Sequence, residues 1–268
     1  MSLRIQTNIA AFDAERNLTA TSDRMQKSMA RLSSGYRINT AADDAAGLAI
    51  SEKLRAQIGG LAQANSNAQD SISLVQTAEG SLNEVHSMLQ RVRDLAVQYK
   101  NGTLSTTDRT AIQSEVSQLG SEIERIGQSA AFNGISLLAA SSTITFQIGA
   151  NDGDSISVST ISLGTAVGSS VFSLTVSGST DISNIDGAIN AVSAQRATFG
   201  AVQNRLEHTI NNLSTYQENL TASESQIRDV DMASEMVEFT KDQILQQAGT
   251  SMLSQANQLP NSVLSLLR

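Results

Sequence analysis

The sequence predicts a mainly α-helical protein, a long antiparallel coiled-coil or helical-bundle rod that carries a small β-hairpin insert. The first observation is an apolar residue at every seventh position over two long stretches. Such spacing holds one stripe of a helix against a partner helix, because seven residues are close to two turns. The second is composition: aromatic residues make up only 3% and there is one proline, at position 260. This rod seam comprises Leu54, Leu61, Ala68, Val75, Leu82, Leu89 and Ala96 in the first stretch and Val192, Phe199, Leu206, Leu213, Leu220 and Ile227 in the second.

The first half of the chain is expected to hold three helices. Residues 3–32 form the first, with an apolar stripe of Ala11, Leu18, Met25 and Leu32. Gly35 ends this helix, since glycine suits the left-handed residue that follows a helix. After an irregular segment, Asp43 or Asp44 caps a long helix that runs to about Lys100, where Asn101-Gly102 stops it. A capping box of Ser105 and Asp108 begins the third helix.

Residues 139–180 differ from the rest and are expected to form the β insert. They contain no Lys or Arg and are rich in Ser, Thr and Gly. Polar and apolar residues alternate over 143–148 and 155–158 on either side of a turn at 151–153, which predicts a hairpin. The run 172–176 predicts a further strand. Asn133-Gly134 marks a turn just before the insert.

The chain returns to helix at Asp181 and ends in a stripe formed by Leu245, Met252, Leu259 and Leu266. No charged residue occurs between 243 and 267, although helices in water usually carry charge. The apolar stripes of the two terminal helices have no partner within their own halves, so they could pair with each other or between molecules. We therefore expect an inner domain of residues 1–42 with 222–268 and a rod domain of 43–221, without further outer domains.

Composition argues against several functional classes. The absence of Cys excludes disulfides and thiolate metal sites. A net charge of −8 without a basic cluster argues against nucleic-acid binding. No apolar run approaches the ~18 residues that span a bilayer, and the apolar patch at 9–12 is too short for the core of a signal peptide. His86 and His208 lie far apart, and no catalytic or phosphate-binding motif occurs. We expect no enzyme activity, no cofactor and no metal site.

Four stretches resemble bacterial flagellins. They are LSSGYRINTAADDAAGLAISEKLR (32–55), SISLVQTAEGSLNEVHSMLQRVRDLAVQ (71–98), AVQNRLEHTINNLS (201–214) and IRDVDMASEMVEFTKDQILQQAGTSMLSQANQLPNSVLSLLR (227–268). The resemblance covers about residues 1–138 and 181–268. It implies a subunit that self-assembles into the flagellar filament and transmits motor torque. The terminal helices would pair into an inner tube around an export channel, with axial packing through Leu18, Met25, Leu32, Leu245, Met252, Leu259 and Leu266.

The resemblance also implies a location and partners. Flagellins leave the cell through a type III export channel without a cleaved signal, which places this chain outside the cell. An export chaperone would cover the C-terminal helix, and filament cap and hook-junction proteins would contact the assembled subunit. The segment 90–98 resembles the part of flagellin that an animal Toll-like receptor binds, which makes Arg91, Leu95 and Glu115 candidate contacts. Packing between subunits would explain the same three residues.

Two alternatives stay open at this point. A hook-filament junction protein shares the terminal helices, and a secreted helical adhesin would have similar helices but would not polymerise into a tube. The sequence also permits sugars on the Ser and Thr residues of 139–180.

Overall fold

The computed structural model describes residues 8–176 and 180–266, with side chains to Gln258 apart from those of 169 and 170. The expected mainly helical fold with a β-hairpin insert is confirmed. In chain order the elements are α1 (Ile9–Ser34), α2 (Ala45–Tyr99), α3 (Thr106–Ser129), β1 (Ala131–Phe132), β2 (Ile135–Ser136), β3 (Thr143–Gln147), β4 (Ser155–Ser159), α4 (Leu163–Val167), the 3-10 helix η1 (Ser169–Phe172), α5 (Asp181–Arg228) and α6 (Met232–Leu266).

Two compact units make up the chain. The terminal unit comprises Met1–Ala56 and Asn219–Arg268, and the central unit comprises Gln57–Glu218. Both limits fall inside helices, because α2 and α5 are continuous across them. The inner and rod domains expected from the sequence, with limits at 42/43 and 221/222, remain a prediction about the assembled molecule.

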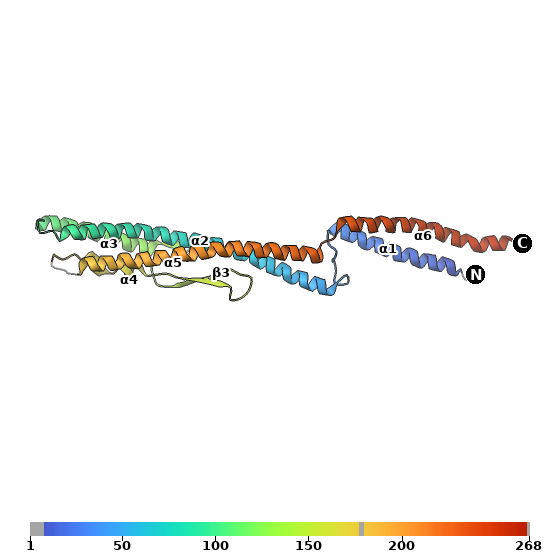
Figure 1. The fold of residues 1–268 in the computed structure, drawn as a ribbon, viewed down its shortest axis with the longest axis horizontal. Coiled ribbons are helices and arrows are strands. Elements are labelled where there is room, and N and C mark those ends of the chain that lie inside the picture. The colour runs from blue at the N-terminus through green and yellow to red at the C-terminus, as the bar shows by residue number, and fades with distance from the viewer. Residues whose placement is uncertain (1–7, 177–179, 267–268) are drawn as a thin grey trace. The chain divides into compact units, whose positions relative to one another are not determined.

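In the central unit, α2, α3 and α5 lie side by side (Figure 1) around a core of aliphatic side chains. Every rod-seam residue of this unit is buried, and Val75, Leu82, Leu89, Phe199 and Leu206 are at most 1% exposed. Leu61 and Leu213 are buried towards one end of the same stripe. Leu54, Leu220 and Ile227 belong to the terminal unit, where they are half-buried.

The helix ends follow the local sequence. The Ser105 hydroxyl accepts from the Asp108 backbone N–H, and the Asp108 carboxylate accepts from the Ser105 N–H in return. The Ser105 hydroxyl also donates to the Asp108 carboxylate, at 2.7 Å. This bond, followed by the one from the Ser105 N–H, holds the pKa of Asp108 below its usual value. Asp44 precedes α2 and accepts from the Gly47 N–H at 2.8 Å. Of the two aspartates expected to cap the long helix, Asp44 is therefore the one that does so.

The described residues form two antiparallel hairpins, one within the expected β insert and one just before it. β3 pairs with β4 as expected, with Phe146 opposite Ile156 and both side chains in the core. β1 and β2 form a second, very short hairpin around the expected turn, where Asn133 and Gly134 have positive φ. Gly60 of α2 lies under the β3–β4 turn, because a Cβ there would be 2.9 Å from the Ala150 side chain.

The prediction of a further strand at 172–176 is wrong. This segment leaves η1 and continues without strand pairing. The side-chain amide of Gln113 donates to the Phe172 carbonyl at 2.7 Å and accepts from the Leu174 N–H at 3.1 Å. A helix side chain thus satisfies the backbone groups that a neighbouring strand would otherwise bind, while Val171 and Leu174 are buried in the core as single anchors.

Candidate assembly surfaces

The interface between α1 and α6 combines half-buried apolar side chains with small and polar ones. The two helices lie side by side in the terminal unit (Figure 1) and approach each other closely. Thr21 and Ser28 of α1 and Asp242 and Ala256 of α6 are buried. A Cβ at Gly249 would lie 3.2 Å from the Leu18 side chain. Small side chains at these positions let the two backbones come close together, as at other tight helix–helix contacts.

Two ion pairs lie on this interface one heptad apart. Arg24 Nε is 3.4 Å from the Asp242 carboxylate, whose side chain is only 5% exposed. Arg31 lies 3.7 Å from the Glu235 carboxylate. From the first pair to the second, the residue number rises by seven on α1 and falls by seven on α6, as expected for antiparallel helices. The two pairs match one antiparallel register and no other, because a shift of one turn would separate both.

The predicted packing residues of the terminal helices fall into two groups. Leu18, Met25 and Leu32 are half-buried and share a stripe with the buried Thr21 and Ser28.

Leu245 and Met252 of the expected α6 stripe do not face α1 in the monomer, so their axial packing remains a prediction about the assembled molecule. These side chains are 43% and 65% exposed. The face of α6 that meets α1 is instead the one with Asp242, Gly249 and Ala256. Leu259 and Leu266 lie outside the described side chains.

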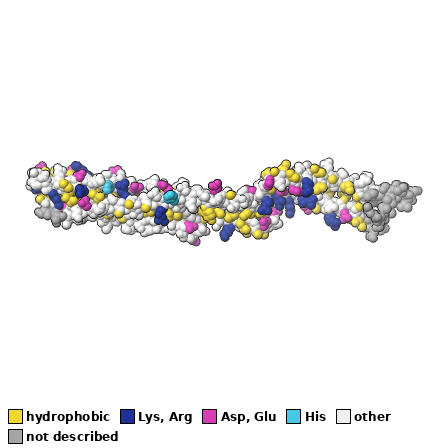
Figure 2. Space-filling model, viewed as in Figure 1, with side chains coloured by type: hydrophobic (Ala, Val, Ile, Leu, Met, Phe, Trp, Pro, Cys, Tyr) yellow, Lys and Arg dark blue, Asp and Glu magenta, His cyan; other side chains and the backbone are white. Residues whose placement is uncertain are grey.

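The outer surface of α6, which faces away from α1, therefore carries large apolar side chains that are exposed in the monomer. Val237 and Ile244, seven residues apart, are 65% and 69% exposed, and Leu245 and Met252 form a second such pair. Figure 2 shows yellow apolar side chains over the visible face of the part that contains α1 and α6. A helix that is apolar on several faces is normally buried on several faces. This outer surface is the strongest candidate for contact with another molecule.

Backbone hydrogen bonds tie together the two links that lead into α2 and out of α5. The Arg37 N–H donates to the Arg228 carbonyl at 2.7 Å, and the Val230 N–H donates to the Gly35 carbonyl at 3.0 Å. The link after α1 and the link before α6 therefore form a short two-stranded contact within the terminal unit. This contact anchors one end of the α1–α6 pair, where α1 ends and α6 begins.

Arg228 completes this junction with its side chain. Its guanidinium stacks 4.9 Å from the centre of the Tyr36 ring and donates to the Glu52 carboxylate at 2.6 Å. The bond from Arg228 holds the pKa of Glu52 below its usual value. With 12% of its side chain exposed, Arg228 is held by α2, by the link after α1 and by its own helix.

The three candidate receptor contacts lie on α2 and α3 and differ in how exposed their side chains are. Arg91 Nε and Nη2 both donate to Glu115 Oε1, at 2.9 and 2.7 Å, which joins α2 to α3. Both side chains are about half exposed. Leu95 is only 2% exposed and belongs to the core. A direct receptor contact through Leu95 therefore stays a prediction, and the folded chain does not present this side chain on its surface.

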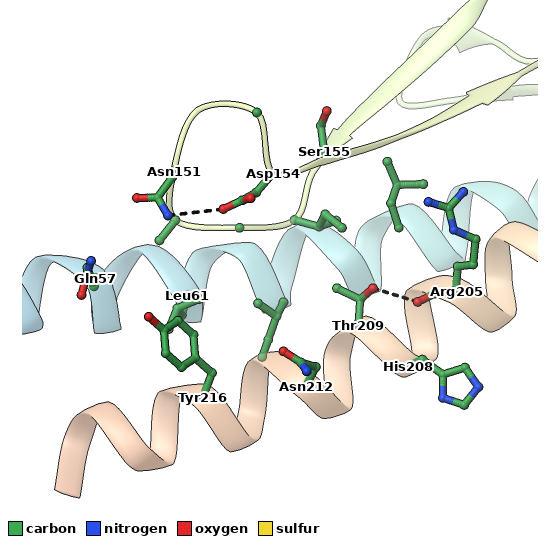
Figure 3. Close-up of a pocket in the computed structure, with 16 residues that line it drawn as sticks. Gln57, Leu61, Asn151, Asp154, Ser155, Arg205, His208, Thr209, Asn212 and Tyr216 are labelled. Atoms are coloured by element: carbon green, nitrogen blue, oxygen red, sulfur yellow. Dashed lines mark hydrogen bonds between the residues drawn. The ribbon is translucent and has the colours of Figure 1, made fainter. Parts of the chain in front are cut away.

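A cavity of about 610 Å³ lies beside the β3–β4 turn. Figure 3 shows the turn with Asn151 and Asp154 over α2, with Leu61 of α2 near Tyr216 of α5, and His208 pointing away from them. His208 and Arg205 are the basic residues that line it. The cavity has no nucleophile paired with a base.

The described part of the chain offers no group of three or more His, Asp or Glu that could hold a metal ion. Within the same residues, no helix is long and apolar enough to cross a membrane. His86 and His208, singled out in the sequence, lie on α2 and α5.

Family models match both arms of the chain. The model of the bacterial flagellin N-terminal helical region matches residues 5–143, and that of the C-terminal helical region matches residues 182–267. This chain belongs to the bacterial flagellin family. The residues between the two matches, 144–181, include β4, α4 and η1.

Full-length relatives agree with this assignment. This flagellin is 52% identical to the flagellin of Halalkalibacterium halodurans, over 98% of this chain and 99% of the relative. It is 51% identical to the flagellin of Bacillus subtilis, over 99% and 100% of the two chains. The crystal structure of Bacillus cereus flagellin is similar with a TM-score of 0.52 and 32% identity, over 59% of this flagellin and 94% of that chain.

Sequence reasoning missed the junction of this flagellin. From the sequence, residues 36–43 are expected only to be irregular. Arg228 follows the rod-seam residue Ile227 and belongs to no motif or apolar repeat. The signal was the Tyr36-Arg37 pair after a helix-ending glycine, but its partners lie about 190 residues away in the chain. Such long-range pairs are not visible in the spacing of one sequence.

Proposed function

We propose that this flagellin is the structural subunit of a bacterial flagellar filament and serves swimming by transmitting motor torque. The observation that carries this proposal is the outer surface of α6, which is apolar and uncovered in the monomer. The family membership supports it, since flagellins are structural proteins. Burying each such side chain between subunits would contribute about 1.5–3 kcal/mol.

The terminal helices would provide the axial contacts. Isolated helices are marginal in water, so the α1–α6 pair gains most from covering its outer face with the same pair of a neighbouring subunit. The first turns of α6 carry Glu235, Glu238, Lys241 and Asp242, whereas residues 243–267 carry no charge. An uncharged segment suits the wall of an export channel, because fixed charges would retain the chains passing through it.

The remaining partners follow from the same surfaces. A flagellar export chaperone would cover the apolar outer face of α6 before export, and the filament cap and hook-junction proteins would contact it at the ends of the filament. Export through the type III channel would deliver this flagellin outside the cell. The chain would need no cofactor for this role.

A Toll-like receptor of an animal host would bind the exposed Arg91 and Glu115. Their ion pair presents both charges on the surface of the central unit. Leu95 would act from the core, by holding the turn of α2 that carries Arg91 in place. Substituting Arg91 by Ala should weaken receptor activation without changing the thermal stability of the monomer by more than about 0.5 kcal/mol.

Seeded polymerisation tests the filament role. Purified monomer and short filament seeds are mixed, and electron microscopy follows the growth of tubes. The variant I244S/L245S should stay folded and fail to extend the seeds, while the control V97S, at a similarly exposed position of the central unit, should extend them normally. Wild-type chains that stay monomeric or only form short capped rings would contradict the proposal and favour a hook-filament junction protein or a non-assembling helical protein.

A further inference from the structure

Four of the methionines lie exposed on the terminal unit. The sequence has seven, and the exposed fractions are 50% for Met29, 49% for Met232, 48% for Met236 and 65% for Met252. Met232 and Met236 lie one turn apart on α6, so they share a face. Among the side chains of α6 described up to Gln258, three of the six exposed large apolar ones are therefore thioethers.

The other described methionines are better covered. Met25 is half-buried on the stripe of α1 that meets α6, and Met88 packs against the core of the central unit. The exposed methionines are thus concentrated on the surface that the proposed filament would bury. Leu or Ile would fill the same space, whereas Met adds a sulfur atom that oxidants can reach.

We propose that Met29, Met232, Met236 and Met252 are oxidation sites at which a peroxide prevents a subunit from joining a filament. This inference rests on the proposed filament function. Each thioether sulfur takes one oxygen atom from hydrogen peroxide, gives up two electrons and becomes a sulfoxide, while the peroxide is reduced to water. The sulfoxide is polar and accepts hydrogen bonds, so burying it without a partner is unfavourable.

The order of events decides the outcome. In the free monomer all four side chains are about half exposed or more, so a peroxide reaches them before assembly covers them. In the filament the same side chains are covered by the neighbouring subunit and react slowly. Oxidised subunits stay out of the growing filament, and a thiol-dependent methionine sulfoxide reductase returns them to the pool, because the sulfoxide is reversible.

The experiment treats the full-length monomer with hydrogen peroxide and measures its growth on untreated seeds, with peptide mass spectrometry to locate the sulfoxides. The oxidised wild type should elongate about tenfold or more slowly than the untreated protein, as expected when buried apolar contacts are lost. The variant M29L/M232L/M236L/M252L keeps side-chain volume and should elongate equally fast with and without peroxide. The matched control M25L/M88L should be slowed like the wild type.

Several outcomes overturn the inference. One is a fully oxidised wild type that elongates like the untreated protein, and another is a treated four-Leu variant that slows as much as the wild type. If that variant assembles poorly by itself, the oxidation rates of the four methionines in wild-type monomers and filaments decide the matter. They should be several-fold slower in filaments, and equal rates would refute the proposal. Untreated wild type that forms no tubes would instead refute the filament function.

Discussion

Shortening Leu206 to Ala tests the assignment of the rod seam. Leu206 is fully buried, with 0% of its surface exposed, in the core shared by α2, α3 and α5. The substitution removes apolar carbons worth about 0.8 kcal/mol per methylene and leaves a cavity, so we expect a loss of about 3–5 kcal/mol. For a unit of this size, such a loss lowers the melting temperature by about 6–20 °C.

The assay is thermal unfolding of the monomer, followed by circular dichroism at low protein concentration. Val97→Ala on α2 is the matched control, because Val97 is 51% exposed and its truncation should change stability by less than about 0.5 kcal/mol. Equal melting temperatures for wild type and Leu206→Ala would refute the seam. A similar loss in both variants would show that the buried position of Leu206 contributes no more to stability than an exposed position on the rod.

Three further predictions address other parts of the chain. Arg24→Ala should destabilise the α1–α6 pair by about 1–3 kcal/mol, because it leaves the buried Asp242 carboxylate without its ion-pair partner. Hydrogen exchange should show a loss of at most about 1 kcal/mol for Arg16→Ala, since the side chains of Arg16 and Asp13 are 79% and 56% exposed. Gly120→Ala should destabilise the central unit by about 1–3 kcal/mol, since the new Cβ would lie 2.7 Å from the Phe172 ring. Gly80→Ala has open space around it and should instead stabilise α2 by about 1 kcal/mol. Chemical denaturation measures both changes. Arg228 lowers the pKa of Glu52 in the folded chain, so the ionised Glu52 stabilises the fold above its unfolded pKa, and this stabilisation is lost as the pH falls through the folded pKa. On acidification, Glu52→Gln should therefore lose less stability than the wild type, as measured by unfolding curves at several pH values. Parallel pH dependence in the two proteins would contradict this.

The lengthwise packing of the helices was predictable because it repeats. Six or seven heptads of apolar residues average out single exceptions, so the buried stripe from Leu61 to Ala96 and from Val192 to Leu213 could be assigned from spacing alone. The ends of helices were also predictable where one residue fixes the local backbone. Gly35 has φ of 76° and ends α1, and Ser105 with Asp108 begins α3.

Features that depend on a single distant partner were not predictable. The alternating run at 172–176 resembles a strand, but Gln113 of α3 satisfies its backbone and no neighbouring strand is needed. Leu95 is the opposite case, a buried side chain among the candidate receptor contacts. A resemblance over 90–98 placed it among candidate contacts, although its spacing of six residues from Leu89 puts it near the buried side of α2.

The terminal helices show why an apolar stripe does not identify its partner. Leu245 and Met252 form the more hydrophobic stripe of α6, yet α1 packs against the stripe with Asp242, Gly249 and Ala256. Small residues allow close approach, and the charged residues of this stripe find counter-ions on α1. Contacts within one chain thus use the stripe of α6 that fixes register together with the half-buried Leu18, Met25 and Leu32 of α1, and the exposed apolar side chains of α6 are left for a partner in an assembly. An antiparallel pair with that division of faces stays soluble as a monomer only at a cost in exposed apolar surface, and repeated stacking of identical pairs removes that cost at every subunit except those at the ends.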